Sequence, residues 1–101
     1  MLRLHSAFLE AGADIILTNS FGANAPRLKL HKAEDRVGEL NIAAAELARA
    51  ATQQHYEDTG RRAVVAGSMG PTGELFEPMG SLNHEQTVAV FTAQAAALAK
   101  G

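Results

Sequence analysis

The sequence predicts an α/β fold in which two parallel strands have flanking helices. Two short, continuous apolar runs, in residues 14–19 and 63–67, have the length and composition of strands buried on both faces of a sheet, which favours parallel pairing. Longer segments with apolar residues at helical spacing lie before, between and after these runs. This alternation is typical of βα units.

The helical segments have recognisable periods and ends. Helices are predicted over residues 3–11, 35–58 and 84–99, with a shorter helix opened by Pro26. The last helix begins at a capping box formed by Asn83 and Gln86. In the long middle helix, one apolar stripe comprises Val37, Leu40, Ala44, Leu47, Ala48 and Ala51. The predicted buried face of the last helix comprises Val88, Phe91, Ala95 and Leu98.

Composition and charge narrow the classes of function. The chain has 101 residues, which suits one domain, and a net charge of −2 with both signs interspersed. That charge gives no electrostatic basis for binding nucleic acid or a membrane surface. The chain has no cysteine, so it can form no disulfide and no thiolate metal site. It has no signal-peptide core and no apolar segment of membrane-spanning length, and the expected location is the cytoplasm.

The glycine-rich segment GSMGPTG, residues 67–73, is the most unusual stretch of the chain. It lacks the Gly-Lys-Ser/Thr ending of a phosphate-binding loop and the G-x-G start of a dinucleotide fingerprint. Its AGSMG portion approximates a nucleophile elbow around Ser68, for which His84 would be the candidate base. Pro71 opposes the immediate helix that this motif needs, so a hydrolase site is not favoured.

The other titratable side chains give weaker indications. Glu74 and Glu77 could form an acid/base pair, but in a turn-rich surface loop we expect plain solvated carboxylates. The histidines share no metal-ligand spacing. Solvated or half-buried structural roles are therefore expected for His5, His31, His55 and His84.

Small polar residues and glycines follow both apolar runs, in residues 18–22 and 67–70. The carboxyl ends of parallel strands meet at one edge of a sheet, where loops and strand-end dipoles form ligand sites. The sequence therefore predicts a shared site at this edge. The alternative is that these residues only satisfy backbone groups in turns.

Three segments, AGADIILTNSFGAN, RLKLH and VAGSMGPTGELFEP, together resemble the homocysteine S-methyltransferase family. This family includes betaine–homocysteine methyltransferases and the homocysteine-binding module of cobalamin-dependent methionine synthase. The resemblance covers essentially the whole chain. It implies a (β/α)₈ TIM-type barrel that transfers a methyl group to homocysteine, giving methionine, with a zinc ion that holds the thiolate. Residues 1–101 would then be a partial homocysteine-binding domain containing the second and third barrel strands.

The same resemblance implies a substrate-binding surface at the strand ends, with no catalytic and no metal-binding residue in this chain. Phe21 would lie on the methyl-donor side, and Asn19, Ser20 and Ser68 would supply hydrogen bonds. The glycines would let the backbone approach the ligand closely. The implied substrate-binding residues are Thr18, Asn19, Ser20, Phe21, Gly67, Ser68, Gly70 and Thr72.

The sequence also departs from the family pattern. The zinc cysteines, the first-strand Asp-Gly-Gly/Ala-Met-Gly motif and the Glu-Thr pair of a later strand are all missing. We therefore expect a truncated, split or excerpted part of a larger βα array, catalytically incomplete and without a cofactor of its own. The alternative is a small α/β module that binds a ligand or acts as a scaffold and completes its sheet by self-association. Uncovered strand edges predict an oligomeric or partly molten isolated chain.

Overall fold

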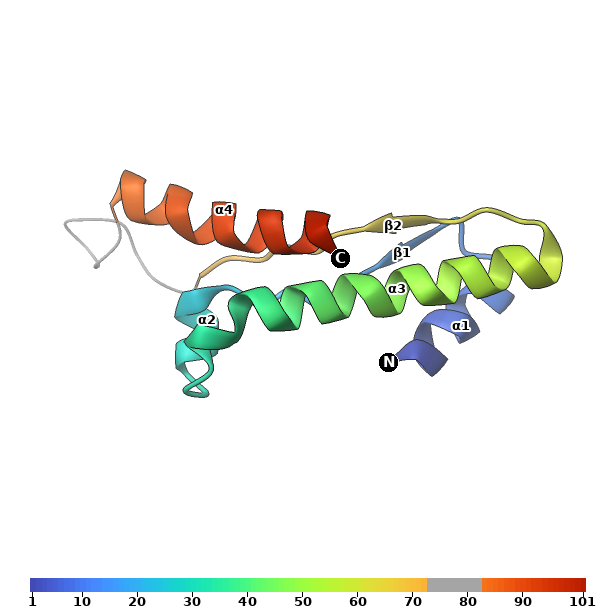
Figure 1. Cartoon of the computed structure of the whole chain (residues 1–101), viewed down its shortest axis with the longest axis horizontal. Coiled ribbons are helices and arrows are strands. Elements are labelled where there is room, and N and C mark those ends of the chain that lie inside the picture. The colour runs from blue at the N-terminus through green and yellow to red at the C-terminus, as the bar shows by residue number, and fades with distance from the viewer. Residues whose placement is uncertain (73–82) are drawn as a thin grey trace.

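The computed structural model describes residues 1–72 and 83–101, and Figure 1 shows the arrangement of their elements. β1 and β2 pair in parallel, with Ile16 opposite Val65. This confirms the α/β class with two parallel strands and flanking helices. In chain order the elements are α1 (Leu2–Glu10), β1 (Ile15–Leu17), α2 (Ala25–Lys29), the 3₁₀ turn η1 (Glu34–Arg36), α3 (Val37–Thr59), β2 (Val64–Ala66) and α4 (His84–Lys100).

The long helix α3 organises the molecule, which measures 52 × 21 × 20 Å. It runs along the strands, with α4 beside its N-terminal half and α1 beside its C-terminal half (Figure 1). It ends at Thr59 and is capped by Gly60, whose left-handed backbone (φ 75°) suits glycine. Among the described residues, none of the helices is both long and apolar enough to cross a bilayer.

Local capping signals were read correctly from the sequence. Asn83 accepts a hydrogen bond from the Gln86 N–H at 2.8 Å, while the Gln86 side chain accepts one from the Asn83 N–H, so the capping box is present. Asn24 caps α2 by accepting from the Arg27 N–H, and Pro26 lies in the first turn of that helix. The predicted capping box and the short helix opened by Pro26 are confirmed, because both depend only on neighbouring residues, whereas the cap at Asn24 was not predicted.

One face of the sheet carries the apolar core, which comprises Leu9, Ile16, Ala48 and Ala51. The small alanines let α3 lie close to the strands. The predicted stripe on α3 is wrong at Leu47, which is 38% exposed. Leu40 is half-buried, and the other predicted members are buried: Val37, Ala44, Ala48 and Ala51. The buried face of α3 is rotated away from Leu47 and includes Asn41 and Ala45.

The other face of the sheet is open, so the prediction that both strands are buried on both faces is wrong for the described residues. Ile15, Leu17 and Val64 are each 61% exposed, whereas Ile16 between them is buried. Burial alternates along β1 because α1 and α3 both pack on the Ile16 side.

The prediction for the buried face of α4 is also partly wrong. Gln94 and Ala97 are its buried residues, with Phe91 and Leu98 half-buried beside them. The predicted pair Val88 and Ala95 is exposed. The helix is turned so that Gln94, rather than an apolar residue, lies at the centre of its contact with the rest of the chain.

Candidate functional site

The loops after β1 and β2 are joined by a ring of hydrogen bonds. The Ser68 N–H donates to Thr18 Oγ1 at 2.9 Å, and Ser20 Oγ donates to the Ser68 carbonyl at 2.8 Å. Thr18 Oγ1 and Ser20 Oγ lie 2.5 Å apart. Ser20 has one hydroxyl proton, which it gives to Ser68, so Thr18 must be the donor in the third bond. The ring therefore runs from Ser68 through Thr18 and Ser20 back to Ser68.

This ring defines what the two hydroxyls do. Thr18 and Ser20 are buried, and each gives its only hydroxyl proton to another member of the ring. Hydrogen bonds linked in series in a poorly hydrated place strengthen one another. Thr18 and Ser20 thus hold the two loops in register, and towards a ligand they could act only as acceptors. Their predicted contact with substrate stays a prediction.

A buried asparagine adds a second link between the same loops. Asn24 is fully buried, and its Nδ2 lies 3.4 Å from the Gly70 carbonyl and 3.3 Å from the Pro71 carbonyl. Its Oδ1 is the α2 cap described above. One side chain therefore fixes both the start of α2 and the position of the loop after β2.

Two further buried amides connect this region to the helices. Asn41 Nδ2 donates to the carbonyls of Ala23 and Val37, both at 2.8 Å. Gln94 Nε2 donates to the Ser20 carbonyl at 2.8 Å and lies 3.3 Å from Asn41 Oδ1. The sequence analysis missed Asn24, Asn41 and Gln94. The available signal was an amide within an otherwise apolar helix face, as for Asn41 four residues after Val37.

Gly67 and Gly70, the two glycines of this loop that the structure describes, pack closely against other segments of the chain. A Cβ on Gly70 would lie 2.7 Å from the Phe21 ring and from the Phe21 carbonyl oxygen, which accepts a hydrogen bond from the Gly70 N–H at 2.9 Å. A Cβ on Gly67 would lie 3.1 Å from Leu98 Cδ1. Both glycines allow close packing between segments of this chain, which is a different role from the predicted close approach to a ligand.

A ligand can reach only some of the eight predicted substrate-binding residues. Phe21 is 60% exposed and Asn19 is exposed, and both line a pocket of about 410 Å³ bordered by Leu28, Leu40 and Leu47. Ser68 is half-buried, Gly67 is exposed, and Thr72 and Gly70 are buried. The structure therefore separates an accessible group from a buried group within the predicted set.

The nucleophile-elbow alternative gains no support. After β2 no helix begins within the residues described up to 72, so Ser68 is not at the strand-to-helix turn that the motif requires. His84 is exposed at the start of α4. Glu74 and Glu77 lie outside the described residues.

His5 differs from the expectation of a solvated or half-buried residue. Its side chain is buried, and its Nε2 has no hydrogen-bond partner in the part of the chain that the structure describes. Burial, together with the positive charge of the N-terminal amino group, lowers the pKa of His5 below the usual 6.5. Helical spacing contained the signal, because His5 lies three residues before Phe8 and four before Leu9 and therefore on the apolar face of α1.

The donor set does not fit the zinc ion that the family resemblance implies. The sequence contains no cysteine, and residues 1–72 and 83–101 hold no group of three His, Cys, Asp or Glu side chains that could bind a metal ion.

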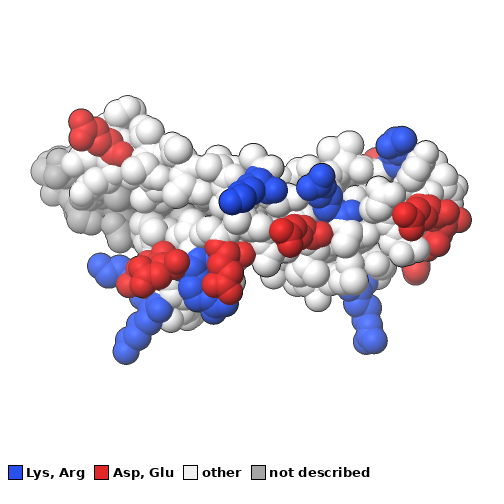
Figure 2. Space-filling model, viewed as in Figure 1, with Lys and Arg blue, Asp and Glu red and all other residues white. Residues whose placement is uncertain are grey.

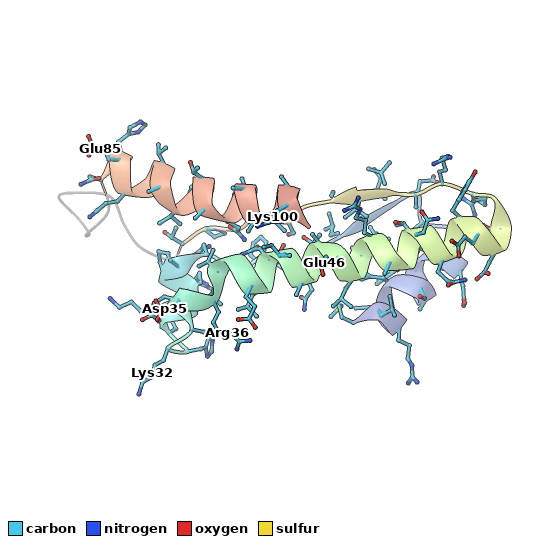
Figure 3. All side chains as sticks on the ribbon, viewed as in Figure 1. Lys32, Asp35, Arg36, Glu46, Glu85 and Lys100 are labelled. Carbon is cyan, nitrogen blue, oxygen red and sulfur yellow. The ribbon has the colours of Figure 1, made fainter. Side chains whose placement is uncertain are left out.

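Charged side chains of both signs are interspersed over the surface shown in Figure 2. Lys32 and Asp35 point outward from the turn before α3 (Figure 3).

Comparison with known protein families shows which family has the two strands and the hydrogen-bonded ring within its matched region. The family model described as homocysteine S-methyltransferase matches residues 1–101. The match includes both strands and the loops that follow them, so every residue of the hydrogen-bonded ring lies within it. The resemblance read from the three sequence segments is confirmed.

Proposed function

Because the chain belongs to the homocysteine S-methyltransferase family, we propose that it forms part of the cavity in which the homocysteine thiol receives a methyl group. The observation that carries this proposal is the joining of the two strand ends into one hydrogen-bonded unit within the matched region. Ligands of parallel α/β folds bind at this edge. The proposed location, the cytoplasm, follows from the sequence alone.

Within that cavity, the exposed and buried residues have different roles. Phe21 offers an apolar surface to the methyl-donor side, and Asn19 offers an amide that can both donate and accept hydrogen bonds to an amino acid. The Ser68 hydroxyl is a third contact. Thr18, Ser20 and Gly70, with buried Thr72, form the support behind these contacts.

We further propose that β1 and β2 belong to a (β/α)₈ barrel. The open sheet face bearing Ile15, Leu17 and Val64 supports this, because strands of a barrel need cover on both sides. α1 packs on the same face as α3 and leads into β1 as α3 leads into β2. His5, whose buried Nε2 has no hydrogen-bond partner among the described residues, lines a pocket together with Ile15 and Leu17 of β1.

We propose that the chain does not catalyse methyl transfer by itself. Thiol activation needs a group that lowers the thiol pKa or removes its proton, and no described residue is placed to do so beside Phe21. The role proposed for this chain is therefore to bind and orient the substrate, while the remaining chemistry needs groups that these residues do not supply.

Titration of the 101-residue chain with L-homocysteine tests the binding proposal. We expect weak binding, which calorimetry or NMR chemical-shift changes at Asn19 and Phe21 would measure. Phe21→Ala and Ser68→Ala should each weaken binding, whereas Leu30→Ala, at a side chain 74% exposed, should leave it unchanged. No saturable binding, or equal losses in all three variants, would contradict the proposal.

The open apolar face favours a second candidate, a self-associating module without catalysis. Exposed apolar surface next to an unpaired strand edge promotes association. In that case sedimentation equilibrium gives an oligomeric mass that Leu17→Lys shifts to the monomer, and Leu30→Lys does not. Association combined with no homocysteine binding would favour this candidate over the first.

A further inference from the structure

We infer that Gln94 is a positioning residue of the strand-end site: its buried amide orients the peptide unit that carries Phe21. The assignment rests on the proposed function for what the site binds, while the contacts themselves are independent of it. Gln94 lies in the middle of α4, 74 residues after Ser20 in the sequence. Nothing in the sequence pattern of this helix predicted a contact between the two residues.

The orientation of the Gln94 amide is fixed by its neighbours. Nε2 faces the Ser20 carbonyl at 2.8 Å and Asn41 Oδ1 at 3.3 Å, and both are acceptors. The opposite orientation would place the amide oxygen against two oxygens. Asn41 in turn uses its own Nδ2 on the carbonyls of Ala23 and Val37. The side chain of Gln94 thus ties the end of β1 to both α3 and α4.

The peptide bond after Ser20 passes this constraint to the candidate site. Its carbonyl accepts from Gln94, and the nitrogen of the same planar unit belongs to Phe21. The carbonyl of Phe21 then accepts from the Gly70 N–H at 2.9 Å. Fixing one peptide plane therefore sets both the direction in which Phe21 leaves the backbone and the position of the loop after β2.

An amide at this place is not the choice that stability alone favours. Gln94 is fully buried, and its Oε1 has no partner among the described residues. A buried acceptor without a donor costs free energy, which an apolar side chain of similar size would avoid. The two contacts of Nε2 are what an apolar side chain could not supply.

Amide hydrogen exchange, followed by NMR in the 101-residue chain, tests this assignment. Gln94→Met keeps the length of the side chain and removes the donor. We expect exchange at the Ser68 and Gly70 amides to accelerate about tenfold or more, because their acceptors, Thr18 Oγ1 and the Phe21 carbonyl, lose their support. The Val64 amide, bonded to the Asp14 carbonyl at the other end of the strands, should keep its exchange rate.

Ala97→Gly is the matched control, because it weakens α4 at its other buried residue without touching Ser20. It should affect the Val64, Ser68 and Gly70 amides alike. An equal effect of Gln94→Met on all three amides, or no effect on any, would overturn the assignment. Unprotected Ser68 and Gly70 amides in the unmodified chain would overturn it as well.

Homocysteine titrations of the same variants separate the assignment from the proposed function. The dissociation constant should rise several-fold in Gln94→Met and stay unchanged in Ala97→Gly. An unchanged constant in Gln94→Met would overturn the positioning role. If the unmodified chain binds no homocysteine, the proposed function fails, and the contrast between the amides of Ser68, Gly70 and Val64 still decides the role of Gln94.

Discussion

The middle of the sheet and the carboxyl ends of its strands are held together by different interactions. In the middle, Leu9, Ile16, Ala48 and Ala51 make an apolar core. At the ends, several buried residues are polar, and hydrogen bonds between their side chains and the backbone connect two loops and two helices. The two regions lie along the same helix, α3, within one small chain.

The two kinds of contact serve different needs, which are stability in the middle of the sheet and a fixed geometry at the strand ends. Apolar contacts are non-directional and tolerate small shifts. Hydrogen bonds depend on distance and angle, so a satisfied buried network specifies one arrangement. The polar network lies behind Phe21 and Ser68, the residues proposed to meet the substrate.

The largest effect is expected from a cavity in the apolar core. Leu9 is 1% exposed, and Leu9→Ala should lower the free energy of unfolding by about 2–5 kcal/mol. Urea unfolding followed by circular dichroism measures the loss. Leu30→Ala should cost less than about 0.5 kcal/mol. Similar small losses for both variants would show that the core is not where this structure places it.

A smaller loss is expected when the ring at the strand ends is opened. Thr18→Val keeps the shape of the side chain but leaves the Ser68 N–H without its acceptor, which should cost about 1–3 kcal/mol. The same urea experiment measures it, with Thr92→Val on the exposed side of α4 as the control. A stability equal to that of the control would mean that the ring contributes little.

A still smaller, pH-dependent effect is expected from His5. Because its pKa is lowered on folding, the unfolded chain binds more protons than the folded chain between the lowered value and 6.5. The free energy of unfolding should therefore fall as the pH drops below about 6.5. Well above that pH, His5 is neutral in both the folded and the unfolded chain and should contribute no pH dependence. Unfolding curves between about pH 8 and pH 5 should show this, and His5→Leu should reduce the slope.

His31→Leu, at an exposed position, is the control for that series. It should keep the slope of the unmodified chain. A slope that survives His5→Leu unchanged would assign the dependence to other groups.

No effect at all is expected from zinc and methyl donors. Zinc should bind no better than to a generic protein surface, and homocysteine, with a typical thiol pKa of about 8.5, should stay mostly protonated at neutral pH. Product assays with betaine, S-methylmethionine or a methylated corrinoid should detect no methionine. Stoichiometric zinc by metal analysis, or turnover that a chelator abolishes, would contradict this prediction.

The fold class, the order of the elements and the family could all be predicted from the sequence. Each follows from local patterns: apolar runs of strand length, 3.6-residue periods, the Asn83–Gln86 capping box and the motifs around the two strand ends. The predicted meeting of those strand ends is also found, because parallel strands bring their carboxyl ends to one edge. Such features depend on neighbours in sequence or on general rules of chain topology.

The sequence did not reveal which side chains are accessible and which ones support them. The exposure of Ile15, the burial of His5 and the donors of Gln94 depend on which helices cover which face, and this is set by contacts between residues far apart in the chain. The sequence shows a serine or threonine at a strand end, but it does not show whether the hydroxyl proton is available to a ligand or is donated to another residue. A hydrogen bond needs two groups at a suitable distance and angle, and the sequence gives the groups but not their relative positions.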